Sequence, residues 1–139
     1  MAIHRLNHAV LYVRNVETSI AFYRDLLDFE VLTHIPGRAG FLRAPKSTND
    51  HDLGLFAMGA GAGPSTAGRS TVGLYHLAWE VETLDDLEHL SERLDDAGAL
   101  VGASDHGTTK SLYVHDPDGL EFEVCWLVPA HLLDEEALA

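Results

Sequence analysis

Two short stretches, LNHAVLYV at residues 6–13 and LYHLAWEV at residues 74–81, decide the fold of this chain. Each alternates between two sets of side chains, as is typical of a strand with two different faces. A shift of 68 residues superposes the first stretch on the second and places His8 on His76. The chain therefore contains an internal repeat, with a histidine at the same position in each copy.

The pattern that follows each stretch extends the repeat. Asn15 caps a helical run, NVETSIAFYRDLLDF, and Thr83 caps a second one, LDDLEHLSERLDDA, which Gly98 closes. Short strand-like runs follow each helix, at 29–34, 40–43 and 52–58 in the first copy, and around 100, at 111–115 and at 120–127 in the second. The sequence predicts an α+β fold in which two tandem βαβββ modules form a concave mixed sheet.

The length of 139 residues is that of one ordinary domain. We expect a single domain over 1–139, with module one at 1–58, a linker rich in Gly, Ala, Ser and Thr at 59–73, module two at 74–128 and an acidic tail at 129–139. The tail is expected to form a short helix and to carry no chemistry.

Composition excludes several classes of function. Nine Lys and Arg face 22 Asp and Glu, and the formal net charge of -13 repels phosphate backbones and anionic lipids. We therefore expect no nucleic-acid partner and no membrane partner. No apolar run approaches the roughly 18 residues of a membrane span, and charged residues interrupt the first 25 positions, where a secretory signal would lie. The single cysteine, Cys125, fits a reducing compartment, so the expected location is the cytoplasm.

The two repeated histidines are candidate metal ligands. A single strand histidine is more often structural, but His8 and His76 lie on the strand face opposite the helix, and paired modules would bring them together. The last strand, LEFEVCWL, offers a carboxylate, because Glu121, Glu123 and Cys125 share one face. These glutamates either face solvent from an edge strand or need a partner such as a metal.

The repeat offset limits the number of ligands. It places Leu55 opposite Glu123, so the first module offers no second carboxylate. Two histidines and one carboxylate with open positions suit non-haem Fe(II), and the same set fits a catalytic Mn(II) or Zn(II) site.

The segments LNHAVLYVRNVETSIAFYRDLLDFEV, LYHLAWEV and LYVHDPDGLEFEV resemble the vicinal oxygen chelate superfamily. This superfamily comprises glyoxalases, fosfomycin-resistance transferases, bleomycin-binding proteins and extradiol dioxygenases. The resemblance covers about residues 3–128, and it implies that His8, His76 and Glu123 are the metal ligands.

Narrower motifs resemble the extradiol dioxygenase branch. In NDHDLGLF, His51 stands where that branch has its acid–base histidine, and Tyr113, ten residues before Glu123, matches its substrate-facing tyrosine. His106, in SDHGTTKSLY, matches a further active-site histidine, although its spacing to Tyr113 is shorter than in the two-domain members. The resemblance implies catalytic roles for His51, Tyr113 and His106, and it leaves open that His106 only supports the site or lies on the surface.

The leading hypothesis is thus an Fe(II) extradiol dioxygenase that cleaves a catechol-type ring with dioxygen. The alternatives are another metal-dependent enzyme of the superfamily, either a glyoxalase-like lyase or a fosfomycin thiol transferase, and a drug-binding resistance protein. Leu55 argues against the lyase, because glyoxalases have a fourth ligand at that position. The acidic net charge argues against a phosphonate substrate, and the presence of all three ligands argues against a drug-binding protein. The expected partners are a small aromatic diol, dioxygen and a second copy of the chain in a homodimer, with the metal site either within one chain or shared between subunits.

Overall fold

The computed structural model describes residues 1–133. The chain divides into two compact units, Met1–Gly63 and Pro64–Ala139. The division falls inside the stretch 59–73 that was expected to link the two modules. Each unit is described below by itself.

The first unit contains one helix and a four-stranded sheet. Its elements are β1 (Ala9–Val13), α1 (Val16–Leu27), β2 (Glu30–Ile35), β3 (Ala39–Arg43) and β4 (Leu53–Ala57). The strand order is β1-β4-β3-β2; β1 runs parallel to β4, and the other neighbours are antiparallel. The predicted βαβββ module with a mixed sheet is confirmed here.

The second unit repeats this arrangement. Its elements are β5 (Leu77–Glu80), α2 (Leu84–Asp96), β6 (Leu100–Asp105), β7 (Thr109–His115) and β8 (Glu121–Leu127), in the strand order β5-β8-β7-β6. β5 runs parallel to β8. A short 3-10 helix, Ala130–Leu132, follows where a helical tail was expected, and the rest of that tail lies outside the described residues.

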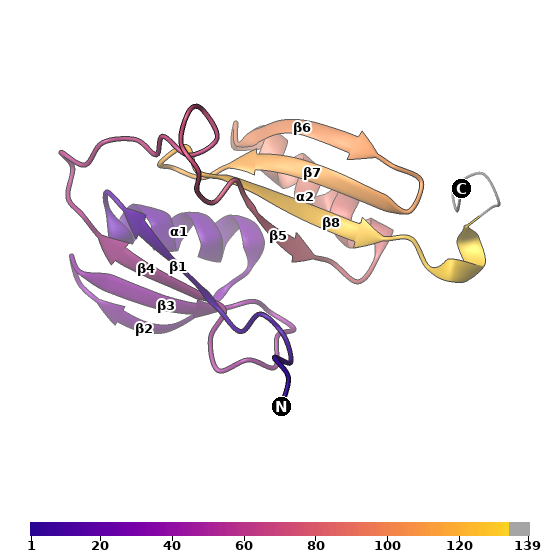
Figure 1. The fold of residues 1–139 in the computed structure, drawn as a ribbon, viewed down its shortest axis with the longest axis horizontal. Helices are drawn as coiled ribbons and strands as arrows, with labels where there is room; N and C mark the ends of the chain where they lie inside the picture. The colour runs from indigo at the N-terminus through magenta and orange to yellow at the C-terminus, as the bar shows by residue number, and fades with distance from the viewer. Residues whose placement is uncertain (134–139) are drawn as a thin grey trace. The chain divides into compact units, whose positions relative to one another are not determined.

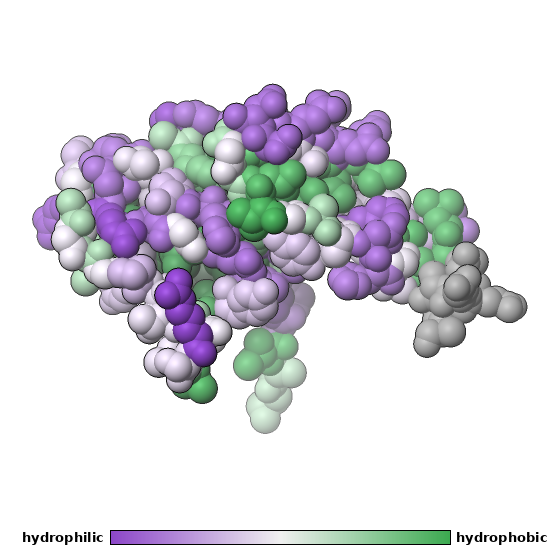
Figure 2. Space-filling model, turned by 90° about the horizontal axis from the view of Figure 1, so that it is seen from above, coloured by the Kyte–Doolittle hydropathy of each residue, from purple (hydrophilic) through white to green (hydrophobic). Residues whose placement is uncertain are grey.

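Each sheet buries the face that its helix covers. In both units the helix lies across one face of its own sheet (Figure 1). Leu53 and Leu55 of β4 and Val114 and Val124 of the second sheet are almost fully buried. The opposite face of the first sheet leaves large apolar side chains exposed, and apolar residues lie among polar ones on the surface shown in Figure 2. The chemistry-bearing side chains lie on these uncovered faces.

The predicted helix starts are confirmed. The side chain of Asn15 accepts a hydrogen bond from the backbone N–H of Thr18, and that of Thr83 accepts one from Asp86. Both satisfy backbone donors that the first helical turn leaves without partners.

The first strand of each module is shorter than the sequence pattern predicts. β1 begins at Ala9 and β5 at Leu77, so His8 and His76 each stand directly before a strand. The ladder of β1 begins where its parallel partner begins, at the pair Ala9 and Leu53. Each histidine therefore lies at the end of a parallel strand pair, one residue outside its hydrogen-bonded ladder.

The strand register corrects the residue that was matched to Glu123. Ala78 pairs with Glu123 in the second unit, and its counterpart Val10 pairs with Gly54 in the first. The equivalent of Glu123 is thus Gly54 and not Leu55, because the second module has one more residue between its first and last strands. A shift of one residue moves a side chain to the other face of a sheet, and Leu55 is indeed buried on the helix side. The prediction that the first module offers no second carboxylate still holds, because glycine has no carboxylate either.

An ion pair beside the start of α1 makes the stability of the first unit sensitive to acid. His34 Nε2 lies 2.7 Å from Glu17 Oε2, and the backbone N–H of Gly37 donates to the same carboxylate. The hydrogen bond with His34, and then that from Gly37, lowers the pKa of Glu17 below its ordinary value. Its contribution to stability is therefore present above the ordinary glutamate pKa and is lost as the pH falls below it.

We expect Glu17→Gln to lower the urea midpoint near pH 7 and to lower it less at an acidic pH below the lowered pKa of Glu17, where the carboxylate becomes protonated. Urea titrations of both proteins at the two pH values measure the difference. Equal differences at both pH values would contradict the assignment.

Candidate metal ligands and catalytic side chains

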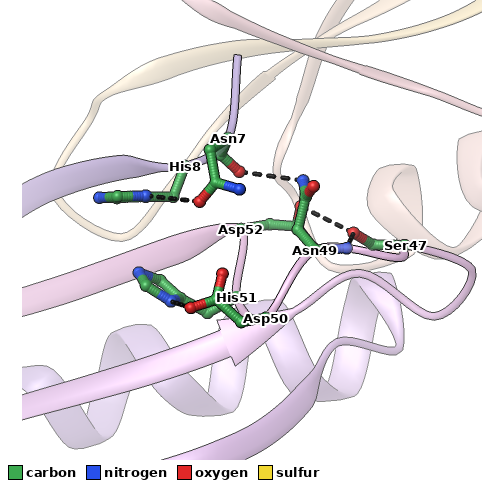
Figure 3. A network of polar contacts seen from close by, with 7 residues as sticks. All are labelled: Asn7, His8, Ser47, Asn49, Asp50, His51 and Asp52. Carbon is green, nitrogen blue, oxygen red and sulfur yellow. Dashed lines mark hydrogen bonds and ion pairs between the residues drawn. The ribbon is translucent and has the colours of Figure 1, made fainter. Parts of the chain in front are cut away.

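In the first unit, His8 and His51 lie against each other. Their ring centroids are 4.4 Å apart with the planes tilted by 39° (Figure 3). The edge of Phe41 contacts His51 with a centroid separation of 5.5 Å, and Nδ1 of His51 lies 3.3 Å from the carboxylate of Asp50. A predicted acid–base histidine and a predicted metal ligand, 43 residues apart in the sequence, are thus neighbours.

The ring of His8 is oriented by the residue before it. Nδ1 of His8 lies 2.8 Å from Oδ1 of Asn7. An amide oxygen only accepts, so Nδ1 is the donor in this contact, and in the neutral ring this leaves the lone pair on Nε2. A neutral imidazole with a free nitrogen is the form that binds a metal.

A hydrogen-bonded loop fixes His51 relative to His8. Asp52 is buried, and its carboxylate accepts from the N–H of Ala44 at 2.8 Å, from Ser47 Oγ at 2.9 Å and from Asn49 Nδ2 at 2.7 Å. The same Nδ2 donates to the carbonyl of Asn7 at 3.0 Å (Figure 3). This network ties the loop that carries His51 to the segment that carries His8.

In the second unit, His76 and Glu123 form a close pair. His76 Nε2 lies 3.2 Å from Glu123 Oε2, and the other oxygen of Glu123 accepts a short hydrogen bond from Ser111 Oγ. The side chains of His76 and Glu123 are 25% and 17% exposed, so both can still be reached from outside the unit.

The separation of this pair fits a shared metal ion. Two ligand atoms that bind one ion at about 2.1 Å, at an angle of about 90–110°, lie roughly 3.0–3.4 Å apart. Nε2 of His76 and Oε2 of Glu123 are within this range at 3.2 Å, a separation that an ion pair also explains. The two residues thus fit as neighbouring ligands without rearrangement.

The predicted ligands belong to both units, His8 to the first and His76 and Glu123 to the second. Within residues 1–133, no three or more His, Cys, Asp and Glu side chains form a group that could hold a metal ion. The structure thus forms two pairs. His8 lies with His51 in the first unit, and His76 lies with Glu123 in the second.

Tyr113 shares the sheet face of Glu123. The two residues pair directly across β7 and β8, and the hydroxyl of Tyr113 lies 3.0 Å from Ser104 Oγ. A tyrosine opposite a candidate metal-ligating carboxylate can donate a hydrogen bond to a molecule bound there.

His106 stands apart from this pair. It lies in the turn between β6 and β7, where its backbone N–H donates to the carbonyl of Thr109, and it is exposed. Tyr113 pairs with Gly102, four residues before His106, so along the strand His106 is on the order of 10 Å or more from the row of Glu123. In its own unit it does not contact the other predicted site residues, and its catalytic role stays a prediction.

Cys125 also shares the face of Glu123. Burial, and then the charge of Glu123, raises the pKa of the Cys125 thiol. In the ladders of β8, Cys125 pairs with Ser111 of β7 and with Glu80 of β5.

Several residues of the site have no clear sequence signal. Ser111 contacts Glu123 across two strands, and Asn49 and Asp52 organise the loop before β4, contacts that only the strand register reveals. Glu121 carried a partial signal, since it alternates with Glu123. The structure places its carboxylate beside the other ring nitrogen of His76, with Nδ1 and Oε2 3.7 Å apart.

Comparison with known families identifies the chain. Residues 5–124 match the glyoxalase/bleomycin resistance protein/dioxygenase superfamily. The protein belongs to this superfamily, in agreement with its two βαβββ modules and with the resemblance seen in the sequence.

Two curated relatives carry dioxygenase names. The chain is 30% identical to catechol-2,3-dioxygenase of Bacillus subtilis (strain 168), in a match covering 86% of this chain and 40% of the relative. It is 34% identical to biphenyl-2,3-diol 1,2-dioxygenase 3 of Rhodococcus globerulus, over 83% of this chain and 59% of that protein. The chain thus spans about half the length of these relatives.

A solved structure of similar length shares the fold. The glyoxylase/bleomycin resistance protein/dioxygenase domain from Frankia sp. EAN1pec superposes with a TM-score of 0.70 at 25% identity, covering 91% of this chain and 99% of that one. No helix within the described part of the chain is long and apolar enough to cross a membrane.

Proposed function

We propose that this protein is a metal-dependent extradiol dioxygenase that cleaves a catechol-type aromatic ring with dioxygen. The observation that carries the proposal is the contact between His8 and His51, whose ring centroids are 4.4 Å apart. It provides a proton-transfer group beside a metal ligand, which is what ring cleavage of a diol requires. The dioxygenase names of two relatives support the same reaction class.

His8, His76 and Glu123 would hold the metal, with Fe(II) as the expected ion and Mn(II) or Zn(II) as alternatives. Two neutral imidazoles and a carboxylate are the ligand set of non-haem Fe(II) oxygenases. When bound, the metal would chelate the two diol oxygens and allow electrons to pass from the ring to dioxygen.

His51 would move the protons of the reaction. Its ring can accept the proton of a substrate hydroxyl and later return it, because imidazole changes its charge near neutral pH. Asp50 beside Nδ1 orients the ring, so that Nε2 is the atom that would exchange the proton. Tyr113 would hydrogen-bond a substrate oxygen from the other unit.

The apolar row beside these residues suits a flat ring. Val10, Gly54 and Phe41 pair across β1, β4 and β3 on the uncovered face of the first sheet. Gly54 has no side chain, and the side chain of Val10 and the Phe41 ring that contacts His51 both lie 3.4 Å from where its Cβ would stand. The aromatic ring of the substrate would lie on this apolar row, against Val10 and Phe41.

The direct test is ring cleavage by the purified protein. The protein is reconstituted with Fe(II) under anaerobic conditions and then given air-saturated buffer and a panel of catechols that includes 2,3-dihydroxybiphenyl. A yellow ring-cleavage product is expected, and Glu123→Ala is expected to abolish it. A protein with a full iron site that leaves every catechol and the dissolved oxygen unchanged would contradict the proposal.

A large side chain at Gly54 should impair binding of substituted catechols. A Cβ at this position would lie 3.4 Å from Phe41 and from Val10, so alanine fits tightly and a leucine must extend into the substrate space. We expect Gly54→Leu to raise KM for 2,3-dihydroxybiphenyl about 10–200-fold, the range for a change in apolar pocket contacts. Gly61→Leu is the matched control, because Gly61 has open space around it. Unchanged KM in Gly54→Leu would rule out this binding mode.

We further propose that the protein is a homodimer. The exposed apolar side chains on the first sheet, which include Val10, Tyr12 and Phe56, need to be covered. Light scattering is expected to give twice the chain mass, and a monomer mass would contradict the proposal.

Co-expression of His8→Ala with Glu123→Ala then shows whether each site is shared between subunits. Shared sites restore about a quarter of the activity, because half the dimers are mixed and carry one intact site of two. Sites within one chain restore none.

A further inference from the structure

We propose that Glu121 is a positioning residue that holds the ring of His76 by accepting a hydrogen bond from its Nδ1–H while Nε2 binds the metal. This inference rests on the proposed metal site, but it concerns a residue to which neither the sequence motifs nor the comparisons assign a role.

The register of β5 and β8 places His76 between two carboxylates. Leu77 pairs with Phe122 and Ala78 with Glu123 in a parallel ladder, so His76 stands beside Glu121. Its Nε2 lies 3.2 Å from Glu123 Oε2, and its Nδ1 lies 3.7 Å from Glu121 Oε2. Each ring nitrogen of His76 therefore faces its own carboxylate.

The contact with Glu121 is not yet a hydrogen bond. His76 Nδ1 and Glu121 Oε2 are both buried atoms without a hydrogen-bond partner, and their separation of 3.7 Å exceeds the usual limit. A buried donor and a buried acceptor that face each other unpaired carry a desolvation penalty. A shift of the ring by under about 1 Å would bring them to hydrogen-bond distance.

The carboxylate of Glu121 is held from its other side. Its Oε1 lies 3.6 Å from Nε2 of His115, the residue opposite it across β7 and β8. Interaction with the carboxylate of Glu121 raises the pKa of the Tyr75 hydroxyl, and the ring centroids of Tyr75 and His76 are 4.5 Å apart. The side chain of Glu121 is only 22% exposed. The carboxylate of Glu121 thus lies between His76 and His115.

This arrangement has a known chemical effect on a metal-bound histidine. A carboxylate that accepts from one ring nitrogen fixes the proton there, leaves the other nitrogen free for the metal and makes the ring a stronger ligand. His8 has a different partner, the neutral amide oxygen of Asn7 at 2.8 Å. The two proposed histidine ligands thus differ in the partner of Nδ1, a carboxylate for His76 and an amide oxygen for His8.

The test measures metal affinity without substrate. Mn(II) is titrated into the metal-free protein, with free Mn(II) followed by electron paramagnetic resonance, for wild type, Glu121→Leu and Glu121→Gln. We expect Glu121→Leu to weaken binding about 10–100-fold, as loss of an outer partner does. Glu121→Gln should restore most of the affinity, because its amide oxygen can still accept from Nδ1. Glu88→Gln, which removes one charge from the exposed side of α2, serves as the control.

The outcomes separate this inference from the proposed function. If wild type and Glu121→Leu bind Mn(II) equally, while Glu123→Ala does not bind, only the role of Glu121 is overturned. If wild type binds no Mn(II), Fe(II) or Zn(II), the metal site itself is overturned. In the Co(II)-substituted protein, Glu121→Gln should keep the visible absorption bands of wild type. A loss of these bands equal to that in Glu123→Gln would show that Glu121 is a ligand and would also overturn the positioning role.

Discussion

His51→Ala is expected to lower kcat for ring cleavage about 10²–10⁴-fold, the usual contribution of a positioned general acid–base group. The ring of His51 lies beside that of His8, a proposed metal ligand, so it would be near a diol bound to that metal. Without it, the substrate proton must leave to solvent. Metal affinity should be unchanged, because His51 is not among the proposed ligands.

Two measurements separate this role from a structural one. The Mn(II) affinity of His51→Ala should equal that of wild type, and the pH profile of kcat/KM should lose the limb due to the histidine. His89→Ala, on the exposed side of α2, is the control and should keep full activity. A His51→Ala protein that cleaves catechols at the wild-type rate would contradict the acid–base role of His51.

Loss of a proposed ligand should have a larger effect. We expect His8→Ala, His76→Ala and Glu123→Ala each to weaken metal binding by more than about a hundredfold. This exceeds the loss of affinity on removing a residue that only hydrogen-bonds a ligand. The reason is that each would leave only two protein ligands, and activity should fall with occupancy. Titration of Mn(II) into the three metal-free proteins measures the effect.

The three variants also differ in what they test. His76 and Glu123 already lie at a ligand–ligand separation, 3.2 Å, within one unit. His8 belongs to the other unit, so its effect tests whether the two units share a site. Wild-type affinity in His8→Ala, with loss in His76→Ala and Glu123→Ala, would contradict a shared site and would place the metal in the second unit alone.

The repeat explains why so much of the fold could be predicted from the sequence. Alternating strands and capped helices depend on local patterns, and these recur in both copies around His8 and His76. The strand faces followed from the same alternation, which places Glu121, Glu123 and Cys125 on one face of β8.

Other features depend on the strand register, and the register in one module does not determine that in the other. The extra residue before β8 moves the equivalent of Glu123 from Leu55 to Gly54. The contact of His51 with His8 and that of Glu121 with His76 join residues far apart in the sequence, through parallel strand pairs. No spacing rule predicts such contacts, because they depend on where each ladder begins.

The most direct measurement of the central claim is the fate of the oxygen atoms. The Fe(II)-loaded protein is incubated with a catechol and isotopically labelled dioxygen, and the product is analysed by mass spectrometry without exchange into water. An extradiol dioxygenase places both labelled atoms in one ring-opened product, through cleavage of the bond adjacent to the diol carbons. A product with one labelled atom or none, or labelled peroxide released beside an oxidised but intact ring, would contradict the account.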